Sequence, residues 1–220
     1  MTGAGRAAAA FATRARAAVS EGGERLARAD RAVMAALPAW RNSRGVAVAR
    51  SVSAMAEPAF AGPLLAAAAL ITARRHGWRA AALPALAVPG GVAARWLASE
   101  LIARPRPPAQ IWLVEPEGPS LPSRHTTLAV LTVGALADAA GVDGAPRWAI
   151  GFLAAATVGA SRVYLGVHWP TDVLAGWLFA EVWLAASGPV TPADRDRPAG
   201  PWSAGRGRPG FGRAVGGGVR

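Results

Sequence analysis

The chain has 220 residues, a length that suits one domain with tails, and a net charge of +11 from 24 basic residues, all arginine, against 13 acidic ones. It contains no cysteine, which excludes disulfides, a thiol nucleophile, an iron–sulfur cluster and a cysteine-ligated zinc site. Hydrophobic residues, mainly alanine, make up 52% of the chain and charged residues 17%, a composition that excludes a disordered protein.

The basic charge is concentrated at the two ends of the chain. Residues 1–50 carry a net charge of +6, residues 51–187 carry +1 and residues 188–220 carry +4. Basic segments of this kind contact an anionic membrane surface or nucleic acid. We expect the membrane surface to be the partner of both tails, with nucleic acid as the less favoured alternative, because the region between them is apolar.

Residues 1–50 form a basic N-terminal arm that is rich in alanine and arginine. Their pattern predicts a helix over residues 5–19, a break at Ser20–Gly23, and a second helix over residues 24–37 that ends at Pro38. An amphipathic arm in solution or on a membrane surface fits this pattern. A signal peptide does not, because no uninterrupted apolar stretch with a cleavage site follows the early arginines.

Five apolar segments fill most of residues 51–187, which we predict to be the membrane-embedded domain. Each approaches the roughly 20 residues that a helix needs to cross a bilayer. Five in succession leave little polar face for the alternative, a soluble helical bundle. We therefore expect an all-α integral membrane bundle of about five to six helices. The segments are residues 59–73, 80–103, 126–142, 148–160 and 171–187.

The C-terminal segment, residues 188–220, is rich in Gly, Pro and Arg without periodicity, which predicts a disordered tail. Four arginines flank the apolar segments on the same side of the membrane as this tail: Arg74, Arg75, Arg79 and Arg147. The positive-inside rule predicts that this side is cytoplasmic. Five crossings then leave the basic N-terminal arm on the outer side, unless a further helix within residues 30–56 is also embedded.

Clusters of polar residues lie at the ends of the apolar segments that face away from the four flanking arginines. Because consecutive crossings alternate in direction, the end of the second segment, the start of the third, the end of the fourth and the start of the fifth share one membrane face. Guanidinium groups bind tetrahedral oxyanions through paired donors, so the clusters favour a phosphate ligand. The clustered residues are Arg104, Arg106, Ser123, Arg124, His125, Arg162, His168 and Asp172.

The two clustered imidazoles and the carboxylate suit cleavage of a phosphate ester. One histidine attacks phosphorus as a nucleophile and the other protonates the leaving oxygen. Asp172, four residues after His168, is placed to accept its ring N–H and to stabilise the cation formed on attack. The alternative is a structural role for each histidine and a topological role for the arginines.

The residues resemble three signatures of the type 2 phosphatidic acid phosphatase (PAP2) family, the lipid phosphate phosphatase and vanadium haloperoxidase superfamily. Ser161-Arg162, followed by His168 and Asp172, matches the third signature. The segment Pro122-Ser123-Arg124-His125 is similar to the second, Pro-Ser-Gly-His, with Arg in place of Gly. Arg106-Pro107 looks like the end of the first, Lys-(six residues)-Arg-Pro. The resemblance covers roughly residues 50–187 and leaves both tails outside it.

The resemblance implies a metal-independent phosphatase that uses no cofactor and passes through a phosphohistidine. His168 would be the nucleophile, Asp172 its orienting partner, and His125 the general acid and then the base that activates water. Arg106 and Arg162 would hold the phosphoryl oxygens, with Ser123 as a further donor. The implied substrate is a lipid phosphate, either a polyprenyl phosphate or diphosphate or a phosphatidate-like lipid, at a cell membrane with an extracytoplasmic site.

One position departs from the family pattern. Ser99 stands where the first signature has Lys, and the chain contains no lysine. Arg95 lies one turn earlier, but helical side chains lean toward the N-terminus, so we expect it to point away from the site. Arg104 or Arg124 would then supply the missing charge. The alternative function is a catalytically weakened or inactive membrane relative that binds lipid phosphate or a partner.

Overall fold

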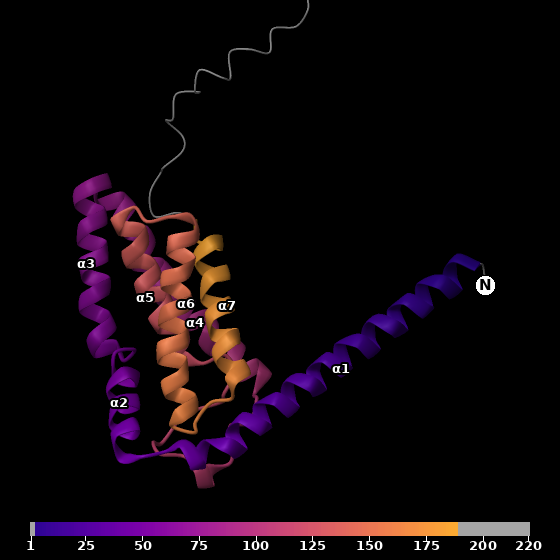
Figure 1. Ribbon diagram of the computed structural model, residues 1–220. Coiled ribbons are helices and arrows are strands. Elements are labelled where there is room, and N and C mark those ends of the chain that lie inside the picture. The colour runs from indigo at the N-terminus through magenta and orange to yellow at the C-terminus, as the bar shows by residue number, and fades with distance from the viewer. Residues whose placement is uncertain (1–2, 189–220) are drawn as a thin grey trace, which may run out of the picture.

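The computed structural model describes residues 3–188, which are almost entirely helical (Figure 1). This confirms the predicted all-α fold. The predicted C-terminal tail lies outside the described residues from residue 189 onward. The elements are α1 (Gly3–Trp40), α2 (Ser43–Ala54), α3 (Pro58–His76), α4 (Trp78–Ile102), the 3₁₀ turn η1 (Ala109–Ile111), α5 (Arg124–Ala140), α6 (Gly144–Tyr164) and α7 (Pro170–Ala186).

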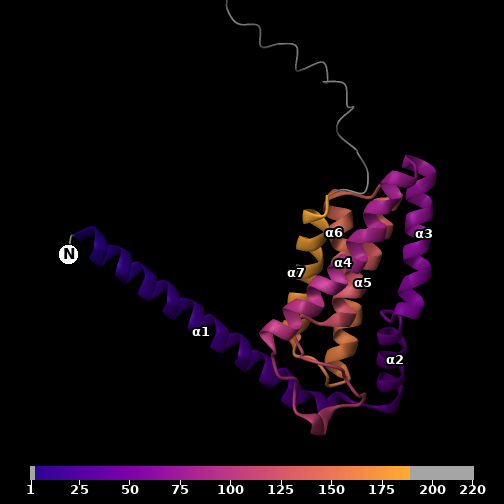
Figure 2. The same ribbon diagram turned by 180° about the vertical axis from the view of Figure 1, so that it is seen from behind.

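Helices α3 to α7 form a bundle in which α5 takes the central place and contacts α3, α4, α6 and α7 (Figures 1 and 2). Most side chains of α5 are buried, and Val130 and Leu131 lie in the main core. The surrounding helices expose large apolar side chains, as an exterior in contact with lipid requires. They include Phe60, Leu64, Leu86, Leu97, Phe152, Leu153, Leu178 and Val182.

The five predicted apolar segments correspond to α3 to α7. By length and hydropathy alone, α4 is the one described helix that is long and apolar enough to cross a membrane. Helices α2 and α3 meet the same criterion when they are taken together across a 43° bend. Helices α5 and α7 have 17 residues each, and α6 is less apolar than α4.

The N-terminal arm differs from its prediction. The structure has one helix, α1, where we predicted a break at Ser20–Gly23 and an end at Pro38. Both predictions are wrong. Each glycine costs a helix only about 1 kcal/mol relative to alanine, and the surrounding alanines favour the helix. Pro38 falls in the last turn of α1, so its missing N–H and its ring disturb only the end of the helix.

The region expected to hold a possible further crossing contains α2. This helix continues the column of α3 beyond the bend and packs against α6, so the pair makes one traverse of the bundle (Figure 1). Helix α1 joins the bundle at the end where the α4–α5 and α6–α7 loops lie (Figures 1 and 2). The basic arm is therefore on the same side as these loops.

Candidate active site

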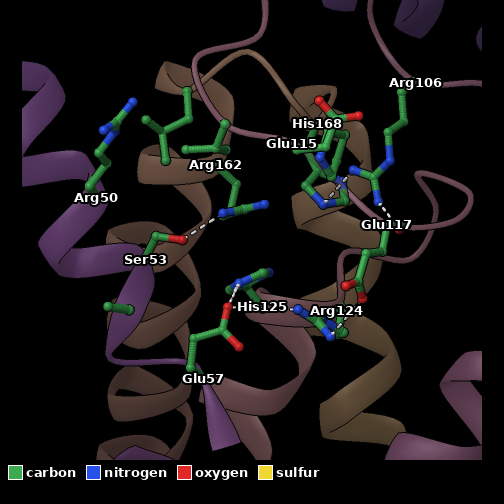
Figure 3. Close-up of a pocket in the computed structure, with 14 residues that line it drawn as sticks. Arg50, Ser53, Glu57, Arg106, Glu115, Glu117, Arg124, His125, Arg162 and His168 are labelled. Atoms are coloured by element: carbon green, nitrogen blue, oxygen red, sulfur yellow. Dashed lines mark hydrogen bonds and ion pairs between the residues drawn. The ribbon is translucent and has the colours of Figure 1, made fainter. Parts of the chain in front are cut away.

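A cavity of about 470 Å³ lies at this end of the bundle. Its walls come from α2, the α2–α3 bend, the α4–α5 loop, the first turn of α5, the last turn of α6 and the α6–α7 loop (Figure 3). The ionisable residues that line it are Arg50, Glu57, Arg106, Glu115, Glu117, Arg124, His125, Arg162 and His168. Segments that are far apart in the sequence thus place four arginines and two histidines around one space.

The structure brings five of the eight predicted site residues to the cavity wall. These five are Arg106, Arg124, His125, Arg162 and His168. Asp172 lies behind His168, in contact with its ring. Ser123 and Arg104 are absent from the wall, and their contacts give them other roles, described below.

His168 is held in one orientation by its carboxylate partner. Its side chain is 1% exposed, and Nδ1 lies 3.4 Å from Oδ2 of Asp172. The Trp169 backbone N–H also donates to Oδ2 of Asp172 at 2.9 Å, which ties the carboxylate to the N-terminus of α7. A proton on Nδ1 leaves the lone pair of a neutral ring on Nε2. Nε2 of His168 is therefore the nitrogen available for attack.

Arg162 lines the cavity and is largely buried. Arg162 is 6% exposed, and its Nη1 donates to Ser53 Oγ at 2.6 Å. Its Nε has no hydrogen-bond partner among the described residues. A guanidinium at the wall of a cavity forms charge-assisted hydrogen bonds with an anionic oxygen. Figure 3 shows the guanidinium above the pair formed by His125 and Glu57. Arg162 is thus placed to hold a phosphoryl oxygen.

Arg106 holds the loops that carry the site. Its guanidinium donates to the carbonyls of Glu117, Gly118, Pro119 and Val167 at 2.6–3.1 Å. The same Nη1 that reaches Val167 lies 3.2 Å from Nε2 of His168. This group therefore fixes the α4–α5 loop against the α6–α7 loop and brings a positive charge to the nucleophilic nitrogen.

His125 pairs with an acid that the sequence analysis missed. Its Nε2 lies 2.7 Å from Oε1 of Glu57, which occupies the N-cap position of α3 at the α2–α3 bend. The pair shares the cavity wall with Arg124, whose Nη2 lies 3.7 Å from the same Glu57 oxygen. An acid just before the first apolar segment is the only signal in the sequence, and it does not identify the partner 68 residues away.

Ser123 and Arg124, which belong to the second signature, lie in different surroundings: Ser123 is buried and Arg124 lines the cavity. Ser123 is fully buried and is the N-cap of α5, where its side chain accepts from the Thr126 hydroxyl at 3.1 Å and more weakly from the Thr126 N–H. It fixes the start of the helix and does not reach the cavity. Arg124 faces the cavity mouth and pairs with Glu57 and Glu117.

Arg104 does not line the cavity, so its predicted role in phosphate binding is wrong. Its Nη1 donates to Oδ1 of Asp172 at 2.5 Å and its Nη2 to Oδ2 of Asp30 at 2.8 Å. Both ends of the guanidinium are engaged by carboxylates, so Arg104 is not available to replace the missing lysine.

The expected direction of Arg95 is wrong. Its Nη2 lies 3.3 Å from Ser99 Oγ, and its Nε donates to the Pro122 carbonyl at 2.7 Å. The guanidinium thus extends toward the C-terminal end of α4 and lies beside Ser99, because a buried backbone carbonyl there accepts its proton. A positive charge occupies the neighbourhood of Ser99, although it comes from a residue one turn away.

The chain is similar to known proteins in sequence and in fold. The profile of the PAP2 superfamily matches residues 64–195. An undecaprenyl-diphosphatase from Sulfolobus acidocaldarius is 47% identical over 49 residues, 20% of this chain and only 24% of that relative's length. The crystal structure of a transmembrane PAP2-type phosphatidylglycerolphosphate phosphatase from Bacillus subtilis is similar with a TM-score of 0.62. Its identity is 25%, and the match covers 77% of this chain and 88% of that one.

Proposed function

The chain belongs to the PAP2 superfamily, and from this premise we propose that it is a metal-independent phosphatase that hydrolyses a lipid phosphate through a phosphohistidine. One observation carries the proposal. His168, with Nδ1 engaged by Asp172, shares a cavity wall with His125 and with Arg162. A nucleophile, a proton donor and an oxyanion ligand around one space are what phosphoryl transfer requires.

The reaction follows from these positions. Nε2 of His168 attacks phosphorus, the bond to the leaving oxygen breaks, and His125 gives that oxygen a proton. Arg162 and the charge of Arg106 stabilise the phosphoryl oxygens. Asp172 stabilises the cationic ring of His168. His125, now neutral, takes a proton from a water molecule that attacks the phosphohistidine, which releases phosphate and restores both histidines.

The substrate is proposed to be a lipid phosphate because of where the cavity lies. It opens at one end of a bundle whose outer faces carry apolar side chains, so an acyl or polyprenyl tail can lie along the bundle while the head group reaches the arginines. The two relatives are named for a polyprenyl diphosphate and for a phosphatidylglycerolphosphate. Both a polyprenyl phosphate or diphosphate and a phosphatidate-like lipid therefore remain candidates.

We place the protein in the cell membrane with the site on the extracytoplasmic side. Arg74, Arg75 and Arg79 lie at the α3–α4 connection and Arg147 begins α6, all at the end of the bundle opposite the cavity. The positive-inside rule assigns that end to the cytoplasm. The basic helix α1 lies at the cavity end, where its arginines are proposed to contact anionic lipid head groups.

The alternative is a membrane protein without activity that binds lipid phosphate, and it is motivated by Ser99 in the lysine position. The test is release of inorganic phosphate from short-chain lipid phosphates by the purified protein in detergent that contains EDTA. We expect release to persist in EDTA, because arginines supply the positive charge that a metal would otherwise provide. Binding of the lipid without release for every head group tried would favour the alternative.

The pH dependence of activity follows from the burial of His168. Burial lowers the pKa of His168 to about 4, and the hydrogen bond that its ring N–H donates to Asp172 only partly offsets this effect. Because the neutral ring is the nucleophile, activity should be retained as the pH falls through 6.5, the ordinary histidine value, and be lost near pH 4. The measurement is kcat/KM against pH, corrected for ionisation of the substrate phosphate. An acidic limb near pH 6.5 that Asp172→Asn shifts would contradict this expectation.

A further inference from the structure

Asp30 is a buried acid on a helix that is otherwise largely exposed. Within residues 20–40 of α1, Asp30 and Met34, one turn apart, are the buried residues. Asp30 is 2% exposed, whereas the nearby acid Glu24 is solvent-exposed and pairs with Arg28 one turn away. Burial of a carboxylate costs several kcal/mol unless partners compensate it. The partners of Asp30 should therefore reveal what this part of α1 does.

The partners of Asp30 belong to the first turn of α7 and to the loop after α4. Oδ1 of Asp30 accepts from the Thr171 backbone N–H at 3.0 Å, and Oδ2 accepts from the Thr171 hydroxyl and, at 2.8 Å, from Nη2 of Arg104. Thr171 is the residue before Asp172. Asp30 thus binds the helix turn that carries the acid partner of the nucleophile.

Arg104 connects Asp30 to the nucleophile. Its other terminal nitrogen, Nη1, donates to Oδ1 of Asp172, while Oδ2 of Asp172 faces Nδ1 of His168. The two acids and one arginine leave a net charge of −1 behind a neutral imidazole. Without Asp30, Arg104 would neutralise Asp172, and this charge would be lost.

We propose that Asp30, acting through Arg104, is a positioning residue for the nucleophile. It holds the first turn of α7 so that Asp172 faces His168, and it shares the positive charge of Arg104. The cluster therefore keeps the negative charge that stabilises the His168 cation formed on attack. This inference rests on the proposed phosphatase function. It assigns the N-terminal helix, which lies outside the matched residues 64–195, a part in the chemistry.

The test compares Asp30→Asn, Asp30→Glu and the control Glu24→Gln, a change at an exposed acid of the same helix. In the full-length protein, Asp30→Asn should lower kcat by about tenfold or more and leave KM within about twofold of wild type, since Asp30 is remote from the cavity. Asp30→Glu keeps the charge and should retain more kcat than Asp30→Asn. Glu24→Gln should match wild type.

The outcomes separate charge from packing. Asparagine has the shape of aspartate, so a purely structural role predicts that Asp30→Asn is the milder change, and that ranking would overturn the proposal. An unchanged kcat for Asp30→Asn, or a change in KM alone, would also overturn it. If Asp30→Asn does not fold, the variant Arg104→Lys is tested in its place, because one amine cannot bridge both Asp30 and Asp172. Its kcat should also fall, and an unchanged kcat would contradict the proposal. A wild-type protein without activity would instead refute the phosphatase assignment.

Discussion

Replacement of His168 by alanine is expected to lower kcat by on the order of 10⁴-fold or more, the scale on which removal of a nucleophile affects hydrolases that form covalent intermediates. His168 lines the cavity, its Nδ1 is engaged by Asp172, and its Nε2 lies 3.2 Å from Nη1 of Arg106. In His168, an acid contacts one ring nitrogen and an arginine contacts the other. Among the described residues, His125 has an acid at Nε2 and no arginine hydrogen-bonded to its other ring nitrogen. The measurement is steady-state phosphate release from a short-chain lipid phosphate in detergent.

Two further variants make the His168 result specific. His168→Asn keeps a polar group near Asp172 in this buried position and should be as inactive as His168→Ala, with a melting temperature closer to wild type. His76→Ala changes the histidine at the end of α3, remote from the cavity, and should leave kcat unchanged. Residual activity within tenfold of wild type in both His168 variants would exclude this residue as the nucleophile.

Replacement of His125 by alanine is expected to have the second-largest effect, and the effect should depend on the leaving group. General acid catalysis contributes about 10²–10⁴-fold, so release of phosphate from an alkyl lipid phosphate should fall by that factor. p-Nitrophenolate leaves without a proton, so its release in the first turnover should be much less affected. Since His125 also serves as the base for water, the variant should release a burst of one p-nitrophenolate per site and then turn over slowly.

Stopped-flow absorbance on His125→Ala with p-nitrophenyl phosphate measures the burst. His76→Ala again serves as the matched control and should behave as wild type. Equal losses for the alkyl and aryl substrates, without a burst, would show that His125 acts before the chemical step and not as a proton donor to the leaving group.

Much of the fold follows from the sequence because its signals are local. The apolar segments lie close to the bounds of α3 to α7, and alternation of crossings places the predicted clusters at one end without knowledge of any contact. The continuity of α1 was missed for an equally local reason. Gly22 and Gly23 suggest a break, but the cost of two glycines is small beside the propensity of a long run of helix formers.

The contacts that tune the site could not be predicted from the sequence. Arg104 and Asp30 are 74 residues apart, and Glu57 and His125 are 68 apart, so no spacing rule connects them. The direction of Arg95 was missed for a different reason. The general lean of helical side chains predicts the opposite direction, but a long side chain follows its buried acceptor, here the Pro122 carbonyl.

The most direct measurement is identification of the phosphorylated residue. His125→Ala, in which hydrolysis of the intermediate should be slow, is mixed with substrate, quenched in base after less than one turnover, digested and analysed by mass spectrometry. We predict a base-stable, acid-labile phosphoryl group on the peptide that contains His168. Turnover without a phosphoenzyme, or a phosphoryl group on another residue, would contradict the account of this protein as a phosphatase that acts through His168.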